Sequence, residues 1–147
     1  MIRLIRSHAI AAAIAAVTFS GPPAMAQNAG KATLVPLSQV TWTGAGIPGV
    51  STAAVQGDMK TGASHFYLKY AAGFVTPPHH HSPDHYVTTV SGNLVLIADG
   101  KEQTMPPGSY FAFTGKARHA ARCEGAQDCV MFIDARGPWD VVVTDKH

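Results

Sequence analysis

Residues 73–92 read GFVTPPHHHSPDHYVTTVSG, and this stretch decides the fold of the chain. Three of its histidines, His79, His81 and His85, follow one another at intervals of two and four residues. On an extended strand, side chains alternate between faces, so His79 and His81 point the same way. Imidazole is the commonest neutral ligand for Zn, Fe, Cu and Ni. The spacing therefore predicts a metal site.

Short segments rich in β-branched and aromatic residues surround this stretch. The expected strands are residues 33–43, 50–56, 63–70, 85–90, 93–98, 109–113, 118–123, 129–134 and 139–144. Turn signals such as Ser91-Gly92-Asn93 and Pro106-Pro107-Gly108 separate them. No segment after the first 26 residues offers a long amphipathic helix. Many short strands at regular spacing predict an all-β fold, an antiparallel barrel of jelly-roll type.

Residues 1–26 have the three parts of a secretory signal peptide. Arg3 and Arg6 give a positive start, residues 9–19 are apolar, and Ala24-Met25-Ala26 is a small-x-small cleavage site. The apolar run is too short for a membrane span. A retained anchor and a chance alanine-rich helix are the alternatives. We expect cleavage after Ala26 and a periplasmic or secreted protein.

The mature chain, residues 27–147, is expected to be a single domain. The whole sequence has 11 Lys+Arg and 9 Asp+Glu, and the signal peptide removes Arg3 and Arg6. The mature domain is therefore formally neutral. Such a domain lacks the basic surface that nucleic acids or anionic membranes attract, so we expect neither as a partner.

Cys123 and Cys129 are separated by five residues that read as a polar turn between two apolar runs. Facing residues at the foot of a hairpin reach bridging distance. An exported protein also meets an oxidising compartment, so we expect a disulfide. A soft metal site or redox pair is the alternative, although the spacing is not C-x-x-C.

Residues 73–92 resemble the first motif of the cupin superfamily. That motif is a glycine, five residues, His-x-His, three or four residues, a glutamate, six residues and a glycine. Gly73, His79, His81 and Gly92 match it, and His85 stands where the family usually has glutamate.

Residues 107–119 resemble the second cupin motif, a Pro-Gly turn followed by a strand and a histidine. The segment begins with Pro107-Gly108 and ends with His119, and Thr114 and Arg118 replace the usual loop prolines. The resemblance implies a small antiparallel barrel with a core at about 63–135 and one divalent transition metal inside. Its ligands would be His79, His81, His85 and His119. Such barrels often pair, so a homodimer is an open expectation.

Replacement of the usual glutamate by His85 changes the chemistry of the implied site. Four imidazoles leave the ion its full charge and favour Fe, Zn, Cu or Ni over Mn or Mg. An octahedral ion would keep two positions for a small-molecule substrate, and the charge would attract an enolate, catecholate or carboxylate.

Less specific interpretations exist for the other candidate residues. His80 is expected to be exposed, His65 to be an ordinary strand residue, and Asp84 to be a surface or outer-shell carboxylate. The aromatic and sulfur-containing side chains are expected to be mainly core: Phe111, Phe113, Met131, Phe132, Tyr86, Tyr110 and Trp139. A barrel without metal, whose histidines are incidental, is the alternative for the cluster itself.

Two classes of function remain open from the sequence. One is a non-haem dioxygenase that cleaves a small enolisable or phenolic substrate. The other is a non-catalytic periplasmic protein that binds a metal or a small ligand. No catalytic residue is identified, because no carboxylate belongs to the implied ligand set.

Overall fold

The structure is a computed structural model that describes residues 30–144. The expected signal peptide, residues 1–26, lies outside the described residues. None of the helical structure between residues 30 and 144 is long and apolar enough to cross a membrane. A compact unit begins at Leu34, and all strands belong to it.

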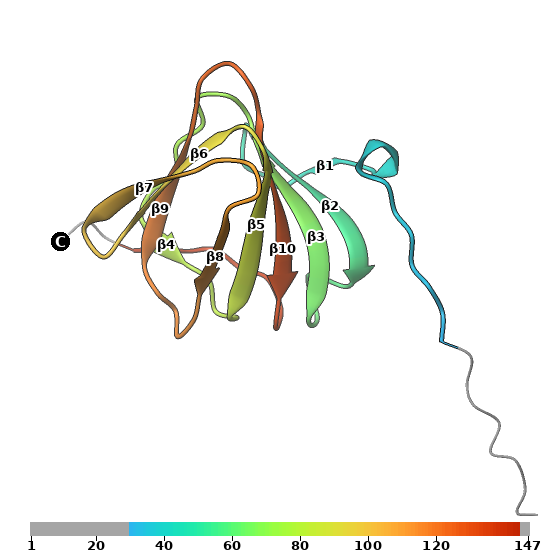
Figure 1. Ribbon diagram of the computed structural model, residues 1–147. Coiled ribbons are helices and arrows are strands. Elements are labelled where there is room, and N and C mark those ends of the chain that lie inside the picture. Colours follow the sequence, from blue (N-terminus) through green and yellow to red (C-terminus); the bar gives the residue numbers. More distant parts are fainter. Residues whose placement is uncertain (1–29, 145–147) are drawn as a thin grey trace, which may run out of the picture. The chain divides into compact units, whose positions relative to one another are not determined.

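Two antiparallel sheets form this unit (Figure 1). The six-stranded sheet runs in the spatial order β1 (Thr43–Gly44), β2 (Val50–Gly57), β3 (Ser64–Tyr70), β10 (Cys129–Ala135), β5 (His85–Ser91) and β8 (Tyr110–Phe113). The five-stranded sheet runs in the order β11 (Val142–Val143), β4 (His79–His80), β9 (His119–Glu124), β6 (Asn93–Ala98) and β7 (Lys101–Met105). The protein is all-β with a jelly-roll architecture, which confirms the predicted fold class.

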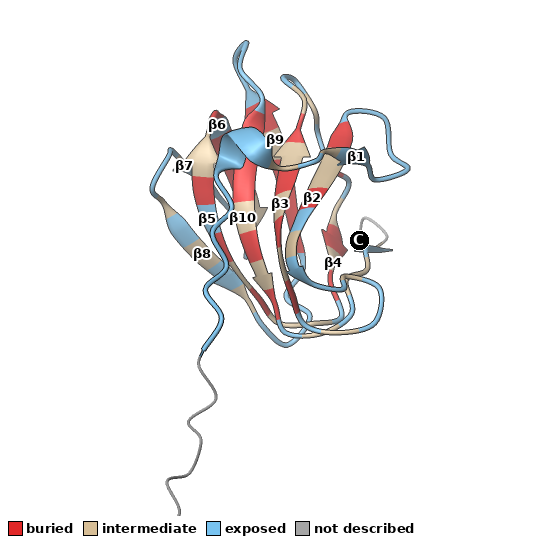
Figure 2. Ribbon diagram, turned by 90° about the vertical axis from the view of Figure 1, so that its right-hand side faces the viewer, coloured by how far each residue is buried: buried red, intermediate tan, exposed pale blue. Residues whose placement is uncertain are grey.

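The core lies between the two sheets, because every second residue of the central strands points inward. Along β3 the positions alternate between buried and half-buried, as Figure 2 shows. The strand register aligns the inward-facing residues of neighbouring strands. Ile133 of β10 pairs with Phe66 of β3 on one side and with Val87 of β5 on the other. Phe66 is fully buried. Leu94 and Leu96 of β6 complete the core from the opposite sheet.

Several expectations about individual elements are wrong. Phe132 and Tyr110 point away from the core: Phe132 packs edge-on against Tyr67 on the outer face, and Tyr110 is 63% exposed. Both residues occupy outward positions of their strands, since the neighbouring residue in each faces inward. The stretch 33–43 is not one strand, because a 3-10 turn (η1, Leu37–Gln39) interrupts it. Of residues 139–144, only Val142–Val143 forms a strand.

The predicted disulfide is confirmed as a bonded pair at the foot of the β9–β10 hairpin. The Cα atoms of Cys123 and Cys129 lie 5.7 Å apart, and both residues are buried. Gly92 lies against this bridge with φ of 82°, and a Cβ there would meet the Cys129 Cα at 2.7 Å. The Cys123 backbone also exchanges hydrogen bonds with Gly73 and Phe74. The bridge therefore anchors the loop that leads to His79.

We expect no free thiol in the protein under denaturing, non-reducing conditions. Changing both cysteines to serine should lower the free energy of unfolding by about 2 kcal/mol, because the closed loop is short. Thiol counting and urea unfolding of the two proteins provide the measurement. Two reactive thiols in protein recovered from the periplasm would contradict the prediction.

Candidate metal centre

Four buried histidines come together at one end of the barrel from three strands. His79 begins β4 and His119 begins β9, and the two residues are direct partners in the antiparallel register. His85 begins β5, and His81 follows β4 by one residue. All four are at most 6% exposed. The structure thus brings together every histidine that the sequence predicted as a ligand.

Three of the four histidines form the tightest group. One ring nitrogen each from His79, His81 and His119 lies within 4.8 Å of the others. Two nitrogens bound to one ion lie at most about 4.2 Å apart, so small side-chain movements would bring the three into ligand positions. These three residues could hold a metal ion.

His85 lies beside this group rather than within it. Its ring centroid is 4.6 Å from that of His81 and 6.0 Å from that of His119. It remains the predicted fourth ligand, at the position where the cupin motif usually has glutamate. No carboxylate belongs to the group within residues 30–144.

A shared hydrogen-bond pattern orients the four rings. Each Nδ1 faces a backbone carbonyl oxygen; the acceptors are Pro77 for His79, Asp140 for His81, Pro83 for His85 and Ala117 for His119. The carbonyl can only accept, so Nδ1 carries the proton and donates it. The lone pair is then left on Nε2 of each ring. This is the arrangement that metal-binding histidines adopt.

Burial keeps the four imidazoles neutral. Removal from water lowers the pKa of His81 to about 3 and that of His119 to about 4. Burial also lowers the pKa of His79 and of His85. In each case the bonded carbonyl opposes the shift without reversing it. At neutral pH the donors are therefore unprotonated, as metal binding requires.

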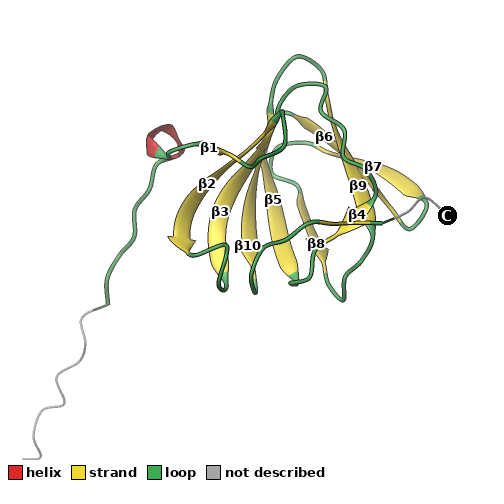
Figure 3. Ribbon diagram, turned by 180° about the vertical axis from the view of Figure 1, so that it is seen from behind, coloured by secondary structure: helices red, strands yellow, loops and turns green. Residues whose placement is uncertain are grey.

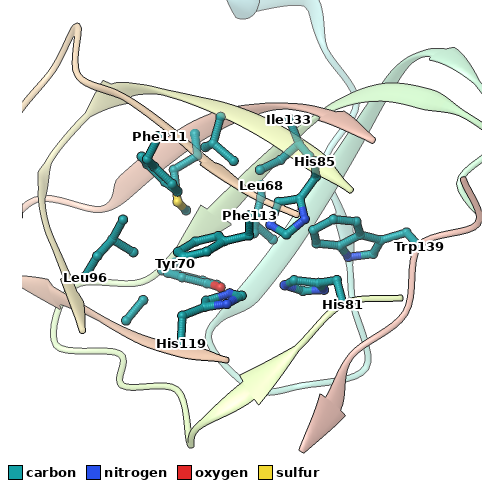
Figure 4. A pocket seen from close by; sticks show the side chains of 13 residues that line it. Leu68, Tyr70, His81, His85, Leu96, Phe111, Phe113, His119, Ile133 and Trp139 are labelled. Carbon is teal, nitrogen blue, oxygen red and sulfur yellow. The ribbon is translucent and has the colours of Figure 1, made fainter. Parts of the chain in front are cut away.

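Two of the four histidine rings stack on aromatic side chains. Trp139 stacks on His81 at a centroid distance of 3.9 Å, and Phe113 stacks on His119 at 3.8 Å. Figure 4 shows both pairs at the edge of the same cavity. Trp139 packs against the core, as the sequence predicted, and its side chain is also a wall of the site. The one sequence feature that distinguishes Trp139 from other core aromatic residues is its position directly after the Gly137-Pro138 turn.

The segment after β10 positions His81 from across the barrel. It leaves the six-stranded sheet and reaches the other sheet, where β11 pairs with β4 (Figure 3). On the way, the Asp140 carbonyl accepts a hydrogen bond from His81 Nδ1–H. The Asp140 carboxylate accepts hydrogen bonds from the Ser82 amide and hydroxyl at 2.7 and 2.6 Å. These contacts, between residues 59 and 58 positions apart in sequence, fix the ligand-bearing loop.

Two cavities adjoin the histidines. The inner cavity has a volume of about 30 Å³, enough for about one water molecule, and lies between His81, His85, His119 and the core. The outer cavity has a volume of about 560 Å³ and reaches His79 and His81 from the side of β1 and β2. Its walls are mainly apolar, with Lys60 as the single lysine or arginine. That volume is typical of small-molecule sites.

The other candidate residues have structural roles. His80 is half-buried rather than exposed, and it lines neither cavity. His65 lies on β3 with its Nε2 3.4 Å from the Asp134 carboxylate. Asp84 accepts a hydrogen bond from the Gly115 amide at 2.9 Å and so ties two loops together. Tyr86 lies under the Arg136 guanidinium, outside the site.

The fold is thus a two-sheet β-barrel in which histidines that could hold a metal ion converge from the strand ends. Residues 66–135 match the family model described as "Cupin domain". This match identifies residues 66–135 as a cupin domain, as the two motifs predicted. No curated protein matches the sequence.

Solved structures share the fold at low sequence identity. KdgF from Halomonas sp. is 19% identical with a TM-score of 0.60, and the match covers 72% of this chain and 94% of that one. The polyketide cyclase RemF from Streptomyces resistomycificus is 17% identical with a TM-score of 0.64, over 80% and 88% of the two chains. The DMSP lyase DddQ from Ruegeria pomeroyi DSS-3 is 16% identical with a TM-score of 0.59, over 73% and 62%. These similarities extend to the fold alone.

Proposed function

We propose that the chain is an exported, metal-dependent enzyme, a non-haem dioxygenase that acts on a small enolisable or phenolic molecule. One divalent transition metal, Fe, Zn, Cu or Ni, would bind to His79, His81, His85 and His119. The observation that supports this most strongly is the common orientation of four neutral imidazoles, each with Nδ1 on a carbonyl and Nε2 left free. The outer cavity beside His79 and His81 supports a small-molecule substrate.

A bound ion would supply Lewis-acid activation of substrate oxygen atoms and, for Fe, redox chemistry with dioxygen. The residues of the chain would bind the ion, orient its ligands and exclude water. The four histidines hold the ion, and the carbonyls of Pro77, Pro83, Ala117 and Asp140 keep the rings oriented. Trp139, Phe111 and Phe113 exclude water from the inner side of the site.

A non-catalytic periplasmic binder of metal or small ligand is the second candidate. The observation in its favour is that no carboxylate joins the histidine group within residues 30–144, and that Asp140, the acidic residue that lines the outer cavity, has its carboxylate hydrogen-bonded to Ser82. Dioxygenase chemistry tolerates this absence better than isomerisation does, because a substrate that binds as an anion needs no base afterwards. The volume of the outer cavity also exceeds what a metal carrier needs.

Oxygen uptake tests the proposal. Fe(II)-loaded protein, prepared without an affinity tag, should consume dioxygen with at least one member of a panel of diketones and catechols. The His81→Ala variant should be inactive with the same compound, and His80→Ala should retain the activity. Stable binding of iron with no uptake for any compound would reject the dioxygenase and favour the binder.

A further inference from the structure

The inner and outer cavities meet at a small set of side chains. Four residues line both: Leu68, Tyr70, His81 and Trp139. Of these four, Tyr70 alone carries a hydroxyl group. A ligand that occupies the outer cavity next to His79 and His81 therefore lies in a space that Tyr70 also lines.

The hydroxyl of Tyr70 has no protein partner. Tyr70 is 8% exposed, and no hydrogen bond to its hydroxyl exists among residues 30–144. Burial raises its pKa to about 12, with no hydrogen bond contributing to the shift. The buried side-chain oxygen and nitrogen atoms without a hydrogen-bond partner among residues 30–144 are Ser64 Oγ and Thr89 Oγ1, so the Tyr70 hydroxyl is not sealed in the core but is open to the cavities that its side chain lines. The hydroxyl can therefore bond to a molecule that enters these cavities.

The position of the Tyr70 hydroxyl favours contact with a molecule bound beside the histidines. Tyr70 ends β3 with its side chain inside the barrel, and its ring packs against Phe74 at a centroid distance of 4.9 Å. In Figure 4 its oxygen projects toward the ring of His119. The O–H thus faces the inner cavity, which His81, His85 and His119 also line.

We propose that Tyr70 donates a hydrogen bond to an oxygen atom of the small molecule that binds in the outer cavity with its polar end at the histidines. This inference rests on the proposed function and names a ligand-contacting residue of that same site. The phenol is neutral and can donate at neutral pH, because burial raises its pKa to about 12.

The lining of the outer cavity defines the class of ligand. Apolar side chains, among them Ile47, Val50, Met59 and Phe74, surround the route to the histidines. Tyr70 supplies a donor at the inner end, and Lys60 supplies a positive charge on the wall. A molecule with a planar or apolar body and a pair of oxygen atoms at one end fits both features. A catechol or an enolised diketone has this form.

Titration with 4-nitrocatechol tests the inference, because its absorbance changes on ionisation and metal binding. The protein is loaded with Zn²⁺, which excludes redox turnover. Tyr70→Phe removes only the hydroxyl and should raise the Kd about tenfold, the loss of one hydrogen bond to a charged oxygen. Its zinc content should stay at about one per chain. Its Tm should be unchanged or higher, since the lost group has no protein partner.

Two controls isolate the hydrogen bond. Tyr67→Phe changes the same strand on its outer face, where Tyr67 packs against Trp42 and Phe132, and should bind 4-nitrocatechol as the unaltered protein does. Imidazole binds metals through nitrogen and then offers no free acceptor, so its affinity should be the same in all three proteins. A Kd for Tyr70→Phe within twofold of the unaltered value would overturn the inference.

Failure of the proposed function has a different signature. Absence of zinc uptake, or absence of 4-nitrocatechol binding by the unaltered loaded protein, would reject the metal-dependent site and this inference with it. A crystal structure of the unaltered protein with zinc and 4-nitrocatechol provides a test that needs no variant. It should place the Tyr70 hydroxyl within about 3.2 Å of a ligand oxygen, and a separation beyond hydrogen-bond distance would overturn the inference.

Discussion

Replacing His81 with alanine should reduce the metal content from about one ion per chain to near zero. His81 touches the rings of His79, His85 and His119, at centroid distances of 4.9, 4.6 and 5.3 Å. It is thus a central member of the cluster. Loss of an outer hydrogen-bond partner costs 10–100-fold in metal affinity, so loss of a ligand should cost more than about 100-fold. Elemental analysis after reconstitution with Zn²⁺, on protein without an affinity tag, measures the effect.

The neighbouring His80→Ala variant is the matched control. The two residues are adjacent, but His80 lines neither cavity and pairs with Val142 at the edge of the sheet. Its removal should leave the zinc content unchanged. Equal loss from both variants would mean that the metal binds to a flexible His-rich loop rather than to a built site.

The second large effect is expected in acid. In the unfolded chain a histidine titrates near its ordinary pKa of about 6.5, whereas in the fold the pKa of His81 is about 3 and that of His119 about 4. Between these values the unfolded state binds more protons than the folded state. The free energy of unfolding of the metal-free protein should therefore be greatest above about pH 6.5 and fall as the pH drops toward 3.

The contribution of one histidine to this loss of unfolding free energy can be estimated from its pKa. The shift for His119 corresponds to roughly 3 kcal/mol at pH 4, at about 1.4 kcal/mol per pKa unit. Urea unfolding at pH 7 and pH 4 measures the loss, and His119→Phe, which retains an aromatic ring against Phe113, should reduce it. Stability that is the same at both pH values would contradict neutral burial of the cluster.

Metal release should follow the same titration. Protons compete weakly for imidazoles whose pKa values burial has lowered, so the ion should be retained well below pH 6.5. Release should then be steep, because several ligands take up protons together. A gradual curve that fits one proton would mean that fewer histidines bind, and His85, which lies outside the tightest group, would be the first to exclude.

The histidine motif was predictable because its spacing follows directly from strand geometry. Two residues of one face, His79 and His81, needed only the period of two, and His119 was implied by the resemblance to the second cupin motif. The strands of the core were predictable for the same reason. Their inward residues, such as Phe66 and Leu68, alternate with polar ones.

Elements without that alternation were missed. β7, Lys101–Met105, is a polar edge strand with four exposed positions, so no hydrophobic period marks it. β4 is two residues long and follows two prolines. Phe132 was assigned to the wrong face because an aromatic residue on an outward strand position looks like a core residue in sequence.

The supporting residues of the site depend on long-range contacts that no local pattern encodes. The Asp140 carbonyl meets His81 only because the segment after β10 crosses to the other sheet. Stacking of Trp139 on His81 follows from the same crossing. In the sequence Tyr70 looks like an ordinary inward strand residue. Its proposed role as a ligand contact follows only from its place between the two cavities.

Anomalous X-ray scattering from a crystal of the untagged, Zn²⁺-loaded protein would locate the metal. We expect one strong peak per chain, at about 2.0–2.1 Å from Nε2 of each ligand histidine. The ligands should be His79, His81, His85 and His119. The absence of a peak between these rings, or a peak located instead at His80 or His65, would contradict this expectation.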